Sequence, residues 1–131
     1  MGKIQITGIQ NKDPLTEKII ACAYKVHGEL GPGFNESIYH NALKIAIEDQ
    51  QLKYQTEKSF NISFHDQNVG KLRLDLIVED KVVVEIKALT GNIPTLFESQ
   101  VLSYLKASGY KVGLLINFGN KSCQIRRLNM A

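Results

Sequence analysis

The chain has 131 residues, of which 44% are hydrophobic and 22% are charged, and its formal net charge is +3. These values are ordinary for one globular domain with its own core, and they exclude a chain that is mainly disordered. No stretch approaches the roughly 20 apolar residues of a membrane span. The two cysteines, Cys22 and Cys123, lack metal-ligand spacing. We therefore expect one cytoplasmic domain, residues 1–131, with reduced thiols.

The first half of the chain predicts a short segment and two helices. We expect residues 1–12 to be a loose or edge segment. Asp13 caps a helix that has Pro14 at its first position and ends in the Gly-Pro-Gly turn at residues 31–33. Asn35 caps a second helix, residues 36 to about 50. We expect its core-facing stripe to be Ile38, Ala42, Ile45 and Ala46.

The second half predicts five strands and one helix. Residues 52–65 alternate as a strand, and a polar turn leads into a hairpin at residues 71–89. Pro94 or Thr95 begins a third helix that ends at Ser108 and is closed by Gly109. Residues 110–118 form a strand buried on both faces, and residues 122–128 form a final polar strand. The order α-α-β-β-β-α-β-β predicts an α+β fold with a mixed sheet, an antiparallel meander and flanking helices.

The hairpin at residues 71–89 organises the candidate site. Its even positions are apolar, whereas its odd positions carry four charges, Arg73, Asp75, Glu85 and Lys87. This alternation requires an odd loop, most simply residues 79–81, so that paired residue numbers sum to 160. Asp75 then faces Glu85, with Cβ atoms roughly 5 Å apart. Because like charges repel, we expect a cation between them, with Lys87 on the same face.

The simplest alternative is a hairpin whose polar face is only solvated. Against it, Ile77 and Val83 lie opposite each other on the charged face, so that face is partly covered. Covered carboxylates need a metal ion or hydrogen bonds. Carboxylate oxygens suit Mg²⁺ or Mn²⁺ better than zinc. A lysine beside such an ion would lie near its bound water or a scissile phosphate, which outlines a site for phosphodiester hydrolysis.

Four motifs resemble one known family. The hairpin, with Asp75 followed by Glu85-Ile86-Lys87, resembles the core motif of the PD-(D/E)xK nuclease superfamily. Residues 30–39, Leu-Gly-Pro-Gly-Phe-Asn-Glu-Ser-Ile-Tyr, look like the signature of its GxxExxY family. Residues 100–104 resemble a Q-x-x-x-Y motif, and residues 113–119 are similar to the family's downstream strand. The resemblance runs from about Asp13 to Arg127 and implies a restriction-endonuclease-like fold.

The resemblance also implies roles for individual residues. Metal ligands would be Asp75, Glu85, Glu36 and the carbonyl of Ile86. Lys87 would position or activate the attacking water, and Gln100 would contact the ligands or the substrate. The supporting residues would be Tyr39, Tyr104 and Arg73. Glu36 also has a simpler explanation, because a glutamate in the first turn of a helix complements the helix dipole. One departure is Phe97, where we expect relatives to carry a histidine.

We weigh three functions. The first is a Mg²⁺- or Mn²⁺-dependent nuclease whose partner is nucleic acid, with DNA preferred. The second is a catalytically silent nucleic-acid-binding or protein-interaction module that keeps the nuclease fold, with a homodimer as one form. The third, a small-molecule phosphate or nucleotide hydrolase, has little support because the chain lacks a glycine-rich phosphate loop.

Overall fold

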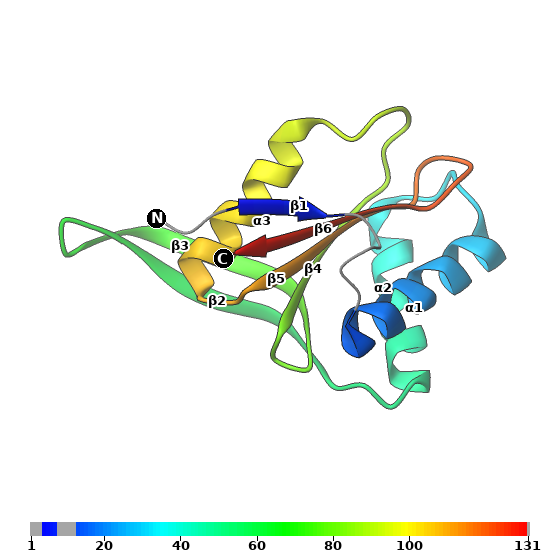
Figure 1. The fold of residues 1–131 in the computed structure, drawn as a ribbon, viewed down its shortest axis with the longest axis horizontal. Coiled ribbons are helices and arrows are strands. Elements are labelled where there is room, and N and C mark those ends of the chain that lie inside the picture. The colour runs from blue at the N-terminus through cyan, green and yellow to red at the C-terminus, as the bar shows by residue number, and fades with distance from the viewer. Residues whose placement is uncertain (1–3, 8–12, 131) are drawn as a thin grey trace.

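A computed structural model describes residues 4–7 and 13–130 of the chain (Figure 1). The helices are α1 (Pro14–Leu30), α2 (Glu36–Asp49) and α3 (Thr95–Ser108). The strands are β1 (Ile4–Thr7), β2 (Tyr54–Phe64), β3 (Gln67–Val78), β4 (Val82–Lys87), β5 (Val112–Asn117) and β6 (Gln124–Met130). The predicted order from the first helix onward is confirmed. β1 adds an edge strand at Ile4–Thr7, in the segment expected to be loose or an edge; residues 1–3 and 8–12 of that segment lie outside the described residues.

The six strands form one mixed sheet in the order β1-β6-β5-β4-β3-β2. Strands β4 and β5 are parallel, and the other neighbouring pairs are antiparallel. Helix α3 connects these two parallel strands, because parallel neighbours need a crossover connection and cannot be joined by a tight turn. Among the described residues, no helix is long and apolar enough to cross a membrane.

Local capping groups account for the helix ends. The Asp13 carboxylate accepts a hydrogen bond from the Thr16 N–H at 2.9 Å, and the Asn35 side chain accepts one from the Ile38 N–H at 3.3 Å. Gly109 closes α3 in the left-handed conformation, with φ of 86°. Because these signals act within one turn, the sequence predicts the helix boundaries closely.

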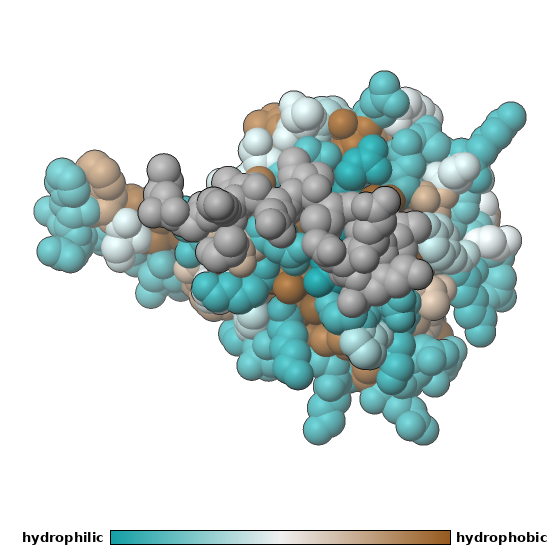
Figure 2. All heavy atoms as spheres, viewed as in Figure 1, coloured by the Kyte–Doolittle hydropathy of each residue, from teal (hydrophilic) through white to brown (hydrophobic). Residues whose placement is uncertain are grey.

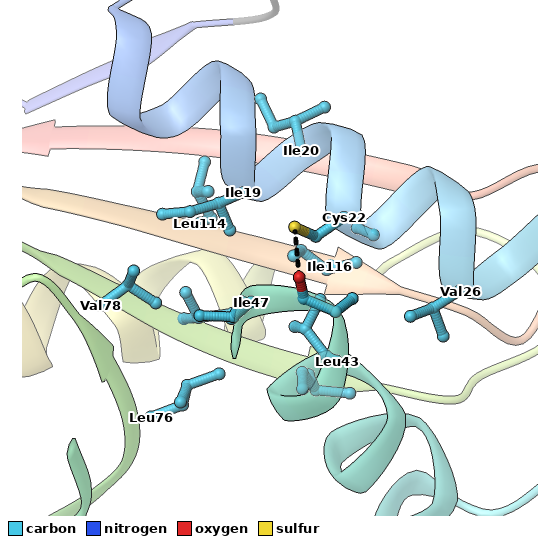
Figure 3. Close-up of a cluster of buried hydrophobic side chains, with 14 of the residues drawn as sticks. Ile19, Ile20, Cys22, Val26, Leu43, Ile47, Leu76, Val78, Leu114 and Ile116 are labelled. Carbon is cyan, nitrogen blue, oxygen red and sulfur yellow. Dashed lines mark hydrogen bonds between the residues drawn. The ribbon is translucent and has the colours of Figure 1, made fainter. Parts of the chain in front are cut away.

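The helices cover the two faces of the sheet and create two hydrophobic clusters. The cluster beneath α1 and α2 includes Ile19, Leu43, Ile47, Leu76 and Leu114 (Figure 3). The cluster beneath α3 includes Ile77, Val83, Val101, Leu105 and Leu115. Strand β5 contributes alternate residues to both clusters, which confirms that it is buried on both faces.

The predicted core-facing stripe of α2 is confirmed at Ala46 and at Ala42, which packs partly buried against the core, but it is wrong at Ile38 and Ile45. Ile38 and Ile45 are 38% and 61% exposed, whereas the buried residues are Tyr39, Leu43, Ala46 and Ile47. The Tyr39 ring stacks on Phe118, with centroids 4.7 Å apart, and its hydroxyl has hydrogen-bond partners, so this aromatic side chain can occupy the core end of the helix. The helix is therefore turned so that Glu36, one turn before Tyr39, lies at the end of its core-facing stripe.

The predicted loop and register of the central hairpin are confirmed, but its length is not. Ile77 pairs with Val83 and Val78 with Val82, so paired numbers sum to 160 around a loop at residues 79–81. The ladder contains only these two pairs. Beyond them β3 pairs with β2 and β4 pairs with β5. Asp75 and Glu85 therefore lie where the strands separate, and their expected ladder pairing is wrong.

Candidate active site

Asp75 lies at the point in β3 where the apolar side chains change from one face of the sheet to the other. Leu76 packs in the cluster beneath α1 and α2, whereas Leu74 packs in the cluster beneath α3. Across the hairpin, Thr56 and Lys58 pair with β3, but the Glu57 between them has a left-handed φ of 56°. The backbone is therefore irregular at this position.

A cleft of about 350 Å³ lies beside Asp75. The residues that line it come from the N-terminal half of α2 and from the hairpin: Glu36, Ser37, His40, Asn41, Glu57 and Asp75. Three of the six are carboxylates, and the lining contains no lysine or arginine. A negatively charged substrate would be repelled from this cleft unless a cation were bound there.

Glu85 is a buried carboxylate, with 14% of its side chain exposed. Burial raises the pKa of its carboxyl to about 7. The Lys87 ammonium, 4.0 Å from Oε1, acts in the opposite direction, while the charges of Asp75 and Glu36 raise this pKa further. Burial also raises the pKa of the Tyr104 hydroxyl, as do the charges of Glu85 and Asp75. The fold thus places Glu36, Asp75, Glu85 and Tyr104 in one electrostatic neighbourhood.

Two cations lie beside these carboxylates. The Lys87 Nζ lies 4.3 Å from the centre of the Phe97 ring, close enough for a cation–π interaction. Phe97, which departs from the expected histidine, therefore covers the lysine instead of making a polar contact. The second cation, Arg73, is more exposed than Lys87, and its Nε is 3.8 Å from Oδ1 of Asp75. Its Nη1 is also 3.8 Å from the carboxylate of Glu57.

The other predicted residues occupy supporting positions. Tyr39 donates a hydrogen bond to the Gly31 carbonyl at 2.5 Å and accepts one from the Phe34 N–H at 3.2 Å. It therefore holds the turn that leads into Glu36. Gln100 is half-buried on α3, four residues before Tyr104, and has no hydrogen-bond partner among the described residues. Ile86 is buried in the cluster beneath α1 and α2.

Two asparagines that the sequence analysis missed hold the chain just after Lys87. The Asn117 side chain accepts a hydrogen bond from the Leu89 N–H at 2.8 Å and donates one to the Leu89 carbonyl at 3.0 Å. Asn120 makes the same two contacts with Gly91, at 2.8 and 2.7 Å. Each amide thus replaces one rung of a β-ladder. The position of Asn117 at the end of an otherwise apolar strand could have identified it, because a buried asparagine needs hydrogen-bond partners.

Gly119 allows residues 117–120 to approach residues 89–91 closely. A Cβ at this position would lie 2.3 Å from the Leu89 carbonyl oxygen and 2.4 Å from its nitrogen. The preceding residue, Phe118, donates a backbone hydrogen bond to the Lys87 carbonyl at 2.9 Å. The segment Asn117–Asn120 therefore connects the end of β4 with Tyr39 on α2, through the Phe118 ring.

The site residues fit a hard divalent cation. Glu85 and Asp75 accept no hydrogen bond from the described residues, and the closest cations are 4.0 and 3.8 Å away. In residues 4–7 and 13–130, no group of three or more His, Cys, Asp and Glu side chains converges as metal ligands. Glu36 is therefore not gathered with Asp75 and Glu85 into a ligand group of three. Two carboxylates are nevertheless sufficient for Mg²⁺, which keeps several of its waters in proteins.

Comparisons with known proteins agree with this architecture. Residues 13–128 match the model of the family described as the PD-(D/E)XK nuclease superfamily. The chain also resembles the crystal structure of SSO0001, with a TM-score of 0.58 and 22% sequence identity. That match covers 87% of this chain and 56% of the other, so the chain spans little more than half the length of SSO0001, and the likeness shows the fold alone. A search of curated proteins gave no match.

Proposed function

Because this chain belongs to the PD-(D/E)XK nuclease superfamily, we propose that it is a nuclease that hydrolyses phosphodiester bonds of DNA with Mg²⁺ or Mn²⁺ as its cofactor. One observation carries the proposal beyond the family. The buried carboxylate of Glu85 lies in the electrostatic neighbourhood of Asp75, at a point where strands separate and Lys87 lies alongside. A buried carboxylate with like-charged neighbours is costly unless it binds a cation.

Each residue then has a defined role. Asp75, Glu85 and the carbonyl of Ile86 would hold the ion, and Glu36 would contact it directly or through a bound water. When bound, such an ion lowers the pKa of water and neutralises charge on the phosphate oxygens. Lys87, held against Phe97, would donate to the attacking water or to the phosphate. Gln100 would contact substrate, and Tyr104 would support the carboxylates.

We further propose that the chain is a GxxExxY-type member of the superfamily. The supporting observation is local. Tyr39 stacks on Phe118, donates a hydrogen bond to the Gly31 carbonyl and accepts one from the Phe34 N–H, so the tyrosine of the motif holds the glycine turn that contains Gly33. Glu36, between them in sequence, is presented to the cleft by the same turn. The motif therefore has a structural reason to supply one acidic residue to the site.

A cleavage assay tests the proposal. Wild-type protein is incubated with single-stranded DNA, duplex DNA and RNA, with Mg²⁺, Mn²⁺ or EDTA. We expect metal-dependent cleavage of DNA that Asp75→Asn and Glu85→Gln abolish. Asp49→Asn, an exposed carboxylate at the end of α2, is the matched control and should cleave normally.

Two results would contradict the proposal. Cleavage that persists in EDTA would remove the metal from the mechanism. Wild-type protein that binds nucleic acid but leaves every substrate intact with both metals would favour the catalytically silent module, and size-exclusion chromatography would then show whether that module is a homodimer.

A further inference from the structure

The end of the long hairpin forms a free two-stranded ribbon. Phe60 and Leu72 are the last residues that pack in the cluster beneath α3. Beyond them, every residue from 61 to 71 is exposed except Ile62, which is half-buried. We call residues 61–71 the hairpin arm. The arm extends away from the helices in the ribbon view and forms a separate projection in the space-filling view (Figures 1 and 2).

The arm is costly to leave without a partner. A two-stranded ribbon is marginally stable by itself, and an exposed sheet edge favours aggregation. Phe64 and Val69 on the arm are nevertheless 65% and 62% exposed. Its turn is tight, because His65 and Asp66 both have positive φ, at 49° and 62°. The sequence therefore builds a well-defined ribbon in solvent, which is typical of a binding surface.

The side chains of the arm match the chemistry of base edges. Asp66 is the one carboxylate of the arm. The exposed hydrogen-bonding and basic residues of the arm are Asn61, Ser63, His65, Gln67, Asn68 and Lys71. Asparagine, glutamine and lysine are the side chains that contact bases in the major groove, and apolar groups contact the thymine methyl. Lys71 has no ion-pair partner among the described residues.

The dimensions and position of the arm also fit duplex DNA. The major groove of B-DNA admits a two-stranded β-ribbon. Strand β3 runs directly from Lys71 to Asp75, a separation of about 13 Å at about 3.3 Å per residue. An arm lying in the groove would therefore bring the adjacent sugar–phosphate backbone close to the candidate active site.

The main rival occupant is the edge strand of a second copy of this chain, added to β2. The structure disfavours it, because β2 is not a regular edge. The register shifts between Ile62 and Ser63, and Glu57 adopts a left-handed conformation. Such irregularities interrupt the row of backbone groups that strand addition needs.

We infer that the hairpin arm enters the major groove of duplex DNA and directs the duplex to the active site. This inference rests on the proposed function and names its substrate class as double-stranded DNA. Asn61 and Asn68 would contact base edges, and Lys71 would contact a phosphate. Phe64 at the tip would contact apolar groups on the floor of the groove.

Equilibrium binding in EDTA tests the inference without cleavage. Fluorescence anisotropy measures the affinity of the full chain for a labelled 20-bp DNA duplex and for an RNA duplex of the same sequence. We expect binding to DNA and much weaker binding to RNA, because the major groove of A-form RNA is too narrow for side chains. The variant Asn61→Ala/Asn68→Ala should bind DNA roughly tenfold more weakly or worse.

Two further variants sharpen this test. Lys71→Ala should reduce the slope of log affinity against log salt by about 1. Lys18→Ala, an exposed lysine on α1, is the matched control and should leave affinity unchanged. A shortened variant joins the register partners Asn61 and Lys71 through an Asn-Gly turn, and circular dichroism checks its fold. If it does not fold, the exposed point variants still decide the question.

The outcomes separate this inference from the proposed function. Arm-dependent binding of duplex without cleavage would overturn the nuclease proposal and support the arm. Normal duplex affinity in all arm variants, or equal affinity for DNA and RNA duplexes, would overturn the arm. Loss of a dimer in the shortened variant, with its DNA affinity unchanged, would assign the arm to a second copy and would also overturn the inference.

Discussion

The two ends of the β2–β3 hairpin differ in packing and charge. Its base, around Glu57 and Asp75, lies between the layers of α2 and α3, has an irregular backbone and lines a cleft with three carboxylates. Its tip, residues 61–71, is exposed, has a bulge after Ile62 and carries one carboxylate. One pair of strands therefore combines an acidic region that lines a cleft with a hydrogen-bonding region that projects into solvent.

The difference shows how one element can separate chemistry from binding. A carboxylate site needs a place beside the core, because partial burial strengthens its interaction with a cation. A surface that binds a polyanion needs few carboxylates and free access. The long hairpin meets both needs because its ends are far enough apart to have different surroundings.

The largest effect should come from a substitution at the base of the hairpin, measured in a cleavage assay. Asp75→Asn should lower kcat at least about a thousandfold, because a metal ligand supplies several kcal/mol of transition-state stabilisation. Its affinity for duplex DNA in EDTA should stay close to wild type. Lys71→Ala on the tip should raise KM with kcat unchanged. Equal losses of kcat in the two variants would remove the division between base and tip.

The next effect concerns the support of the base. Asn117 is fully buried, and Asn117→Ala removes the side-chain partners of the Leu89 N–H and carbonyl. Leaving such groups unpaired should lower the free energy of unfolding by roughly 2 to 4 kcal/mol. Urea denaturation followed by circular dichroism measures this change. Gly119→Ala should also destabilise the fold, because its Cβ would overlap the Leu89 backbone.

A pH effect should follow from Glu85 in metal-free protein. Its folded pKa of about 7 is above the ordinary value of 4.5, so the folded state binds the proton more tightly than the unfolded state. This difference contributes to the free energy of unfolding fully below pH 4.5, and the contribution is lost as pH rises through 7. At pH 8, Glu85→Gln should raise the free energy of unfolding by up to about 3 kcal/mol.

A pH series of urea titrations checks this expectation, with Glu29→Gln, an exposed glutamate on α1, as the control. Saturating Mg²⁺ should remove most of the destabilisation of wild type at pH 8, because the ion binds only the folded state. A difference between Glu85→Gln and wild type that does not vary with pH would contradict the assigned pKa.

The smallest effect should come from the tip. Phe64→Ser should change the free energy of unfolding by less than about 0.5 kcal/mol, because the side chain is mostly exposed and contacts little beyond the His65 ring. The same urea titration measures it. A loss comparable with that of Asn117→Ala would show that the tip is part of the folded core and is not a free arm.

Features that depend on neighbouring residues could be predicted from the sequence. Asp13, Asn35 and Gly109 act within one turn, so the three helices begin and end close to their predicted positions. The alternation of residues 72–88 determined the hairpin loop and its register, because a slip of one residue would reverse its faces. Four motifs in order were sufficient to indicate the superfamily.

The way in which these parts pack together depends on long-range contacts. The rotation of α2 depends on the stacking of Tyr39 on Phe118, and the separation of β3 from β4 depends on their other partners, β2 and β5. The amides of Asn117 and Asn120 bind backbone groups more than 25 residues away. No local pattern records such contacts, because they join residues that packing alone brings together. The sequence therefore identified the acidic residues, and tertiary packing buried Glu85 and placed Asp75 beside a cleft at the base of the hairpin while leaving its tip exposed.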